Sequence, residues 1–220
     1  MPLCRIGTKL IYFCHVPKCG GTAVEKYLEN RFGRLAFLDP HFYAMDAENR
    51  WPKSSPQHIP DQELTRLFPA GFFDASFAII RHPVDRLASV FLYQRLLEKR
   101  IAKDVRFENW LEILADQKAE NPYIYDNHIR PMIDFVPKTA NVFRLEDGLA
   151  AVIDWLDSQA MDASGPRQIP PANVLADRLA HANQAKIEFT VSPAARDLIS
   201  DIYRVDFERF GYAPAAPTRY

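Results

Sequence analysis

Two short apolar runs, each followed by a helical pattern, organise the first half of the chain. The runs are KLIYFCHV at residues 9–16 and SFAIIR at residues 76–81, and both are rich in β-branched and aromatic side chains. Unbroken apolar runs of this length are typical of strands buried on both faces of a parallel sheet. A proline follows each run, and apolar positions then recur at the helical period, as in Val84, Leu87 and Phe91. The pattern predicts two strand–turn–helix units.

Two further segments carry weaker strand patterns. They are RLAFLD at residues 34–39 and NVFRLE at 141–146, and the second leads into the helical pattern GLAAVIDWLDSQ. Strands that alternate with helices predict an α/β fold in three layers, with a central parallel sheet flanked by helices. The 220 residues, 48% of them hydrophobic, suit one domain over 1–220. We expect the loop-rich stretches 39–61 and 158–173 to be excursions from that domain.

The charge balance limits the classes of partner. The 27 lysines and arginines against 28 acidic residues give a formal charge of -1, so the chain lacks the basic surface of a nonspecific nucleic-acid binder. Any anion site must therefore be local. We find no apolar run of membrane-spanning length and no secretory-signal pattern at the start, so we expect a cytoplasmic protein. Oligomeric state is left open.

The three cysteines are sparse. Cys4, Cys14 and Cys19 have no metal-ligand partners at useful spacing, which fits reduced thiols in a cytoplasm. Cys19, next to a predicted helix start, has two interpretations: a reactive thiolate or a small residue that packs a loop. The packing interpretation is favoured.

The segment PKCGGT, residues 17–22, joins the first strand to its helix, and we call it the glycine turn. At the carboxyl end of a parallel strand, such a turn points backbone N–H groups and a helix dipole at an anion. Gly20 and Gly21 permit close approach of the backbone, Lys18 supplies a charge, and Thr22 adds a hydroxyl. The alternative is an ordinary tight turn with a solvated lysine. The lysine precedes both glycines, so the segment is not the GxxxxGK[ST] loop of nucleoside triphosphatases.

The segment RHPVDRLAS, residues 81–89, supplies a second candidate anion site. Arg81 closes the second strand, and Ser89 lies two turns into the following helix. A guanidinium and a hydroxyl can together hold one phosphate group, because the guanidinium matches phosphate oxygens bidentately. For Arg86 we favour a salt bridge to Asp85 or Asp147.

These two segments carry a family resemblance. HVPKCGGT followed by IIRHPVDRLAS resembles the paired signature of sulfotransferases that use 3′-phosphoadenosine 5′-phosphosulfate (PAPS). The resemblance implies that Arg81 and Ser89 bind the 3′-phosphate. It implies that the 5′-phosphosulfate is bound by Lys18, Cys19, Gly20, Gly21, Thr22 and Ala23. The segment SPAARDLISDIYRVDFERFGY, residues 192–212, and the strand FRLED resemble the carbohydrate-directed branch of this family.

The resemblance also implies a mechanism. Sulfuryl transfer to a hydroxyl resembles phosphoryl transfer, in which positioning and charge neutralisation dominate. Lys18 is then expected at the bridging oxygen, where it stabilises charge on the departing 5′-phosphate, while the N–H groups of Gly21 and Thr22 hold nonbridging oxygens. This scheme requires no metal, and we find no carboxylates or histidines at metal-ligand spacing.

The acceptor hydroxyl needs a general base, and histidine is the natural side chain for it. His58, in a proline-rich loop before a helix, resembles the position of the catalytic histidine in glycan O-sulfotransferases, and it is our first candidate. His128 is the second, and an ordinary loop histidine is the remaining interpretation. Asn127, His128 and Arg130 are alternatively expected to line the acceptor cleft, where Arg130 would pair with an acidic sugar.

The residues that would bind the nucleoside of PAPS match the family pattern less fully. HANQAKIEF at residues 181–189 resembles the segment that covers adenine, with Asn183 in the position of the usual asparagine, but Gln184 and Ala185 replace the small hydroxyl residue that commonly follows.

Aromatic residues at near-helical spacing belong to a hydrophobic core more often than to a ligand-binding surface, so we expect the aromatic residues near the end of the chain to pack onto the core. These residues are Tyr203, Phe207, Phe210 and Tyr212.

The sequence thus predicts a PAPS-dependent O-sulfotransferase that acts on a carbohydrate hydroxyl. Two alternatives stay open: a nucleotide kinase or triphosphatase with a related phosphate turn, and a nucleotide-binding module without catalytic activity.

Overall fold

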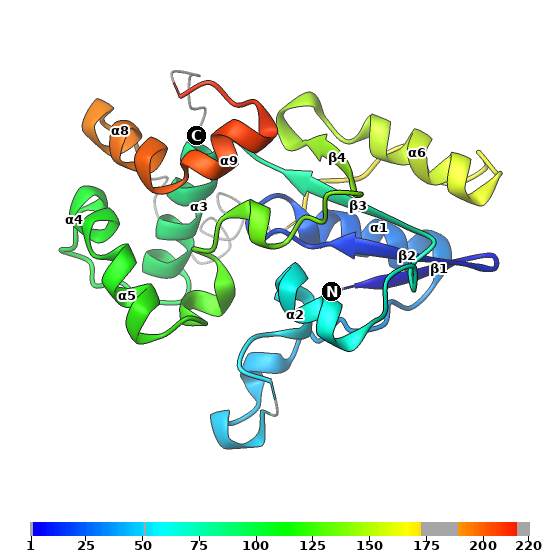
Figure 1. Ribbon diagram of the computed structural model, residues 1–220, viewed down its shortest axis with the longest axis horizontal. Coiled ribbons are helices and arrows are strands. Elements are labelled where there is room, and N and C mark those ends of the chain that lie inside the picture. The colour runs from blue at the N-terminus through cyan, green and yellow to red at the C-terminus, as the bar shows by residue number, and fades with distance from the viewer. Residues whose placement is uncertain (1, 51, 173–188, 215–220) are drawn as a thin grey trace. The chain divides into compact units, whose positions relative to one another are not determined.

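The chain folds into two compact units, each built from two separate stretches (Figure 1). The computed structural model describes residues 2–50, 52–172 and 189–214. The first unit holds the described residues of Met1–Ile80 and Asp134–Ala172, and the second those of Arg81–Ile133 and Asn173–Tyr220. The expectation of one domain stays a prediction.

A sheet of four strands forms the centre of the first unit, among its described residues. In sheet order they are β1 (Leu3–Ile6), β2 (Lys9–Cys14), β3 (Ala75–Ile80) and β4 (Asn141–Arg144). Strands β2, β3 and β4 run parallel, whereas β1 pairs antiparallel with β2. The last four residues of both β2 and β3 are buried, as their apolar runs predict. Strand β1 was not predicted from the sequence pattern.

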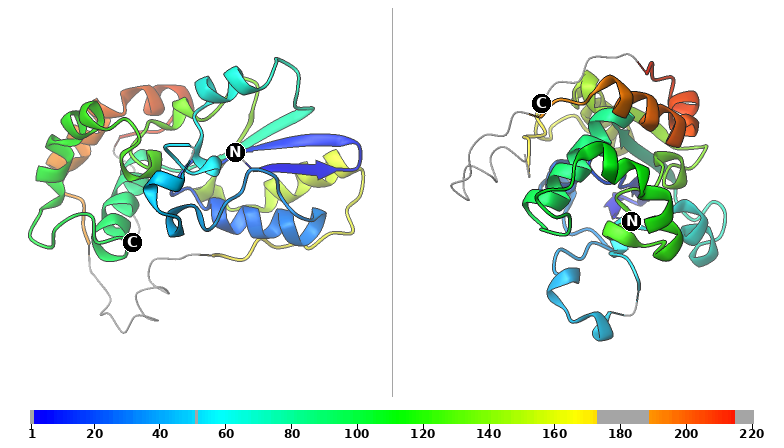
Figure 2. Two further views of the ribbon diagram at one scale, coloured as in Figure 1. Left: turned by 90° about the horizontal axis from the view of Figure 1, so that it is seen from below. Right: turned by 90° about the vertical axis from the view of Figure 1, so that its left-hand side faces the viewer.

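Helices cover both faces of this sheet. Helices α1 (Gly21–Phe32) and α6 (Ala150–Ala160) lie on one face, and α2 (Asp61–Leu67) lies on the other (Figure 2, left). On the α6 side, Phe13 of β2 stacks on Phe77 of β3 with ring centroids 4.9 Å apart, and Trp155 of α6 lies 5.0 Å from Phe77. The predicted α/β fold with a central sheet flanked by helices is confirmed, with an antiparallel edge strand added.

Residues 34–39 do not form the strand that their pattern predicts. Ala36 makes an isolated antiparallel bridge to Leu3, in which each backbone N–H donates to the other's carbonyl at 3.0 Å. Phe37 then takes a left-handed backbone (φ 55), which turns the chain away before a second pair can form.

The stretch 39–61 is a loop excursion, as expected. Its described part contains the short 3-10 turns η1 (Phe42–Ala44), η2 (Ala47–Asn49) and η3 (Pro56–His58). Another such turn, η6 (Leu145–Asp147), links β4 to α6.

The second unit is helical. Its described elements are α3 (Pro83–Leu96), α4 (Phe107–Glu112), α5 (Leu114–Glu120), η4 (Ile124–Asn127), α8 (Pro193–Ile202) and α9 (Arg204–Phe210), and η5 (Met132–Asp134) lies at its boundary. Residues 192–212, which resemble the terminal helix of the carbohydrate-directed branch, form two helices, α8 and α9, separated at Tyr203. Tyr203 and Phe207 lie in the core of this unit, which confirms the packing role expected for them. None of the helices in the described parts of the chain is long and apolar enough to cross a bilayer.

Candidate functional site

The glycine turn connects the end of β2 to the start of α1 through left-handed backbone. Lys18 has φ 67 and Gly20, the residue before the helix, has φ 82. Glycine adopts this region freely, whereas a lysine there is strained, and such strain is found at functional sites. A Cβ at Gly20 would also lie 3.1 Å from the Leu145 side chain.

Gly21 is required for a different reason, which is its contact with His15. A Cβ at position 21 would lie 2.1 Å from Nε2 of His15, which is closer than two nonbonded atoms can approach. Position 21 therefore requires glycine, because the buried imidazole of His15 lies where a Cβ would be. Close approach of a ligand is the role predicted for both glycines, and the packing of Gly21 against His15 is a role that the sequence pattern does not indicate.

The start of α1 favours an anion electrostatically. The helix has 12 residues and no acidic side chain in its first turn, so its amino-terminal dipole is not cancelled there. Lys18 and Thr22 are half-buried, while Ala23 is buried and its N–H donates to Gly20 O at 3.1 Å.

All three cysteines are buried, and none of them forms a disulfide. Burial raises the pKa of the Cys4 thiol to about 12. Cys19 is 1% exposed and its thiol donates to the Pro17 carbonyl at 3.7 Å. Reactive cysteines are partly exposed, so this burial favours the packing interpretation of Cys19.

A buried group of titratable side chains lies beside the glycine turn. Nδ1 of His15 is 2.5 Å from Oε1 of Glu25, and the rings of His15 and His58 meet edge to face with centroids 4.7 Å apart. Nδ1 of His58 is 3.2 Å from Oγ of Ser55. Burial alone raises the pKa of Glu25, but the charge of His15 and the hydrogen bond from its ring outweigh burial, so the pKa of Glu25 lies below its usual value.

The second predicted anion motif lies in the second unit. Arg81 directly follows β3, and Ser89 is in the second turn of α3; both side chains are half-buried. Arg86 is fully buried, and its Nη2 donates to the backbone carbonyl of His128 at 2.9 Å. Arg86 thus supports the segment that carries the second candidate base.

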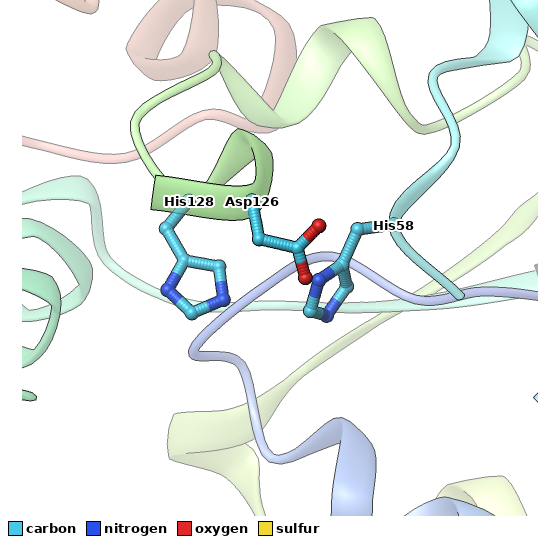
Figure 3. A group of neighbouring side chains, drawn as sticks. All are labelled: His58, Asp126 and His128. Atoms are coloured by element: carbon cyan, nitrogen blue, oxygen red, sulfur yellow. The ribbon is translucent and has the colours of Figure 1, made fainter. Parts of the chain in front are cut away.

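That segment has an unusual backbone. Tyr125, Asp126 and Asn127 are consecutive residues with φ values of 53°, 56° and 64°. The Asp126 and His128 side chains extend from the same side of this turn, whereas His58 lies at the end of η3 (Figure 3). A run of left-handed residues is costly and persists only where its surroundings hold it.

Contacts from α3 and the terminal helices hold this segment. Nε2 of Gln94 is 3.3 Å from Nδ1 of His128, and Tyr203 donates its hydroxyl to Ile129 O at 2.6 Å. The fully buried Asp206 accepts backbone N–H bonds from Met132 at 2.8 Å and Ile133 at 2.9 Å. Asn127 is fully buried and accepts from Nε of Arg130 at 2.8 Å, so Arg130 is itself tied to this turn.

We expect Asp206→Ala to lower the free energy of unfolding by about 3 kcal/mol, because it leaves one buried and one partly buried N–H group without their charged acceptor. Urea denaturation followed by tryptophan fluorescence measures this change. Asp201→Ala, an exposed change on α8, serves as the control and should stay within about 0.5 kcal/mol of the unaltered protein. Equal losses in the two variants would show that Asp206 does not anchor the segment.

Sequence reasoning missed Glu25, Gln94 and Asp206 as parts of the candidate sites. Glu25 did leave a signal, because it lies four residues after Gly21 and three before Leu28, within the buried stripe of α1. A charged residue in such a stripe indicates a buried partner. Asp206 left the same kind of signal, because it lies three residues after Tyr203 and four before Phe210, within the buried stripe of α9. Gln94, three residues after Phe91, is likewise a polar residue in the buried stripe of α3.

A model of the sulfotransferase family matches residues 3–213. The chain belongs to the sulfotransferase family. A crystal structure of a sulfotransferase from Alicyclobacillus acidocaldarius also matches, with 12% identity, 90% of this chain and 92% of that chain covered, and a TM-score of 0.45. A search of curated proteins gave no match.

The predicted site residues of this sulfotransferase divide between its units. The glycine turn and His58 belong to the first, and Arg81, Ser89 and His128 belong to the second. The family match spans stretches of both. Asn183, the predicted adenine contact, lies outside the described residues.

Proposed function

We propose that this sulfotransferase moves a sulfuryl group from PAPS to an acceptor hydroxyl, and that the acceptor is a carbohydrate. The observation that carries the proposal is the glycine turn, in which left-handed Lys18 and Gly20 lead into the uncancelled amino terminus of α1. The donor is further supported by the resemblance of both anion motifs to PAPS-binding sequences. The carbohydrate acceptor is supported by the resemblance of residues 192–212 to the glycan-directed branch.

In this proposal the glycine turn binds the 5′-phosphosulfate. The N–H groups of Gly21 and Thr22 hold nonbridging oxygens, and Lys18 neutralises the charge that grows on the departing 5′-phosphate. Sulfuryl transfer through a loose, in-line transition state depends on such positioning and neutralisation, so the scheme needs no metal ion.

Arg81 and Ser89 are proposed to bind the 3′-phosphate. We expect Arg81→Ala to weaken binding of adenosine 3′,5′-bisphosphate by about 2 to 4 kcal/mol, because a bidentate, charge-assisted contact is lost. Affinity for adenosine 5′-monophosphate, which lacks the 3′-phosphate, should hardly change. Calorimetric titration with both nucleotides tests this, and equal losses would refute the assignment.

The acceptor hydroxyl is proposed to lose its proton to His58. This ring is buried beside Ser55 and His15, and buried contacts restrict its orientation, as a positioned base requires. His128 is the second candidate. Asn127 and Arg130 are proposed to contact the acceptor, and Arg130 would pair with an acidic sugar.

Cytoplasmic location belongs to the same proposal. It is supported by the three cysteines, which form no disulfide and suit a reducing compartment.

Titration calorimetry followed by a transfer assay tests the proposed activity. Tight binding of adenosine 3′,5′-bisphosphate, weak binding of ATP with Mg²⁺, and transfer from PAPS to a member of a glycan panel would support it. Preference for ATP with Mg²⁺ would instead indicate a nucleotide kinase or triphosphatase. Bisphosphate binding without transfer to any hydroxyl acceptor would indicate a nucleotide-binding module.

A further inference from the structure

One buried pair beside the glycine turn has no role in the proposed chemistry. His15 is 7% exposed and Glu25 is 6% exposed, and their side chains meet at 2.5 Å. Buried ionisable groups are costly and need compensation. The presence of the His15–Glu25 pair beside the glycine turn therefore needs an explanation.

The carboxylate determines which ring nitrogen of His15 carries a proton. Glu25 favours its ionised form, so it accepts a hydrogen bond and Nδ1 of His15 donates it. The opposite nitrogen, Nε2, faces Gly21, the first residue of α1. The imidazole thus spans the distance from Glu25 to the backbone of the glycine turn.

The surroundings of His15 hold the ring in this position. Phe13 stacks on it with centroids 5.6 Å apart, and His58 meets it edge to face. Glu25 and His58 are titratable groups that contact the ring. The close approach to Gly21 means that a rotated ring would leave the turn without its support.

Glu25 also creates an electrostatic problem for anion binding. It lies one helical turn after Gly21, so an uncompensated carboxylate would repel a phosphosulfate bound at the start of α1. The imidazolium form of His15 makes the pair neutral.

We propose that His15, oriented by Glu25, is a positioning residue of the donor site: it supports the glycine turn at Gly21 and cancels the Glu25 charge when the 5′-phosphosulfate binds. This inference rests on the proposed function, since it assumes that the glycine turn binds that group. It adds a residue that the proposed chemistry does not use.

The charge part is tested by calorimetry on His15→Ala, Glu25→Gln and the double variant. His15→Ala should weaken adenosine 3′,5′-bisphosphate binding by about 10- to 100-fold, because it leaves a like charge near the 5′-phosphate. Adenosine 3′-monophosphate, which lacks that phosphate, should lose less than about threefold. Adding Glu25→Gln should restore most of the bisphosphate affinity, whereas a merely structural role predicts no rescue.

Controls and a second substitution complete this experiment. Glu29→Gln on the exposed side of α1 and His41→Ala in the exposed loop should leave both affinities unchanged. If His15→Ala does not fold, His15→Gln replaces it, since glutamine can donate to Glu25 but carries no charge. The same selective loss of bisphosphate affinity is expected.

The steric part is tested without a ligand, by thermal denaturation. Gly21→Ala should lower the melting temperature in the unaltered protein but much less in the His15→Ala (or His15→Gly) background, where the ring is absent. Equal effects in both backgrounds would overturn the support role. Unchanged bisphosphate affinity in His15→Ala would overturn the charge role. If the unaltered protein binds neither nucleotide, the proposed function itself fails, while the thermal comparison still decides whether His15 supports the turn.

Discussion

His58→Ala is expected to lower turnover by about 10²- to 10⁴-fold, the usual scale for the loss of a positioned general base. Only neutral histidine can accept the acceptor's proton, so turnover of the unaltered enzyme should fall on the acidic side as His58 becomes protonated. The His58→Ala variant should lack this decrease of turnover at low pH, which is the acidic limb of the pH–rate profile. Affinity for PAPS should survive, because the proposed phosphate contacts are made by other residues. Steady-state kinetics across pH, at saturating donor, measures both effects.

His128→Ala is the matched control, because it removes the other candidate base. If His128 lines the acceptor cleft, its loss should mainly raise KM for the acceptor. Should His128→Ala abolish the acidic limb while His58→Ala leaves turnover intact, the two histidines exchange roles. His58 would then be an ordinary loop residue packed on Ser55 and His15.

Lys18→Ala is expected to lower turnover by about 10²- to 10³-fold, a scale typical of losing one group that stabilises transition-state charge. The lysine contributes most when charge develops on the departing phosphate, so product affinity should fall much less than turnover. Lys18→Arg should not restore full activity, because a guanidinium presents its donors in a fixed planar fork rather than as a compact charge. Single-turnover kinetics with saturating PAPS separates the two effects.

Near-normal turnover of Lys18→Ala under these conditions would show that the lysine only anchors the donor. Lys26→Ala, an exposed change on α1, is the control for loss of a positive charge in the same region. It should leave turnover and affinity unchanged.

Both kinetic predictions depend on residues that the sequence itself indicated. The glycine turn was recognised because its lysine and paired glycines follow a buried apolar run and precede a helical pattern. Strand β3 and helix α3 were recognised in the same way, around Arg81 and Pro83. Such signals are local, since strand burial, turn residues and helical period are expressed within about ten consecutive residues.

The pattern failed where a segment's structure depends on its neighbours in space. Residues 34–39 have the apolar composition of a strand, yet the left-handed backbone at Phe37 limits them to one bridge. Strand β1 forms instead, and its four residues are too few for a clear period-two pattern. Propensity for strand is weak compared with such context.

The class of the fold and the position of the glycine turn follow from short-range patterns of residues. What surrounds that turn depends on tertiary packing. His15, directly after β2, and Glu25, on α1, meet across the glycine turn, whereas Asp206 reaches the N–H of Met132 across 74 residues of chain. The Asp206 contact arises from packing between distant segments, and no local pattern of residues identifies the partner.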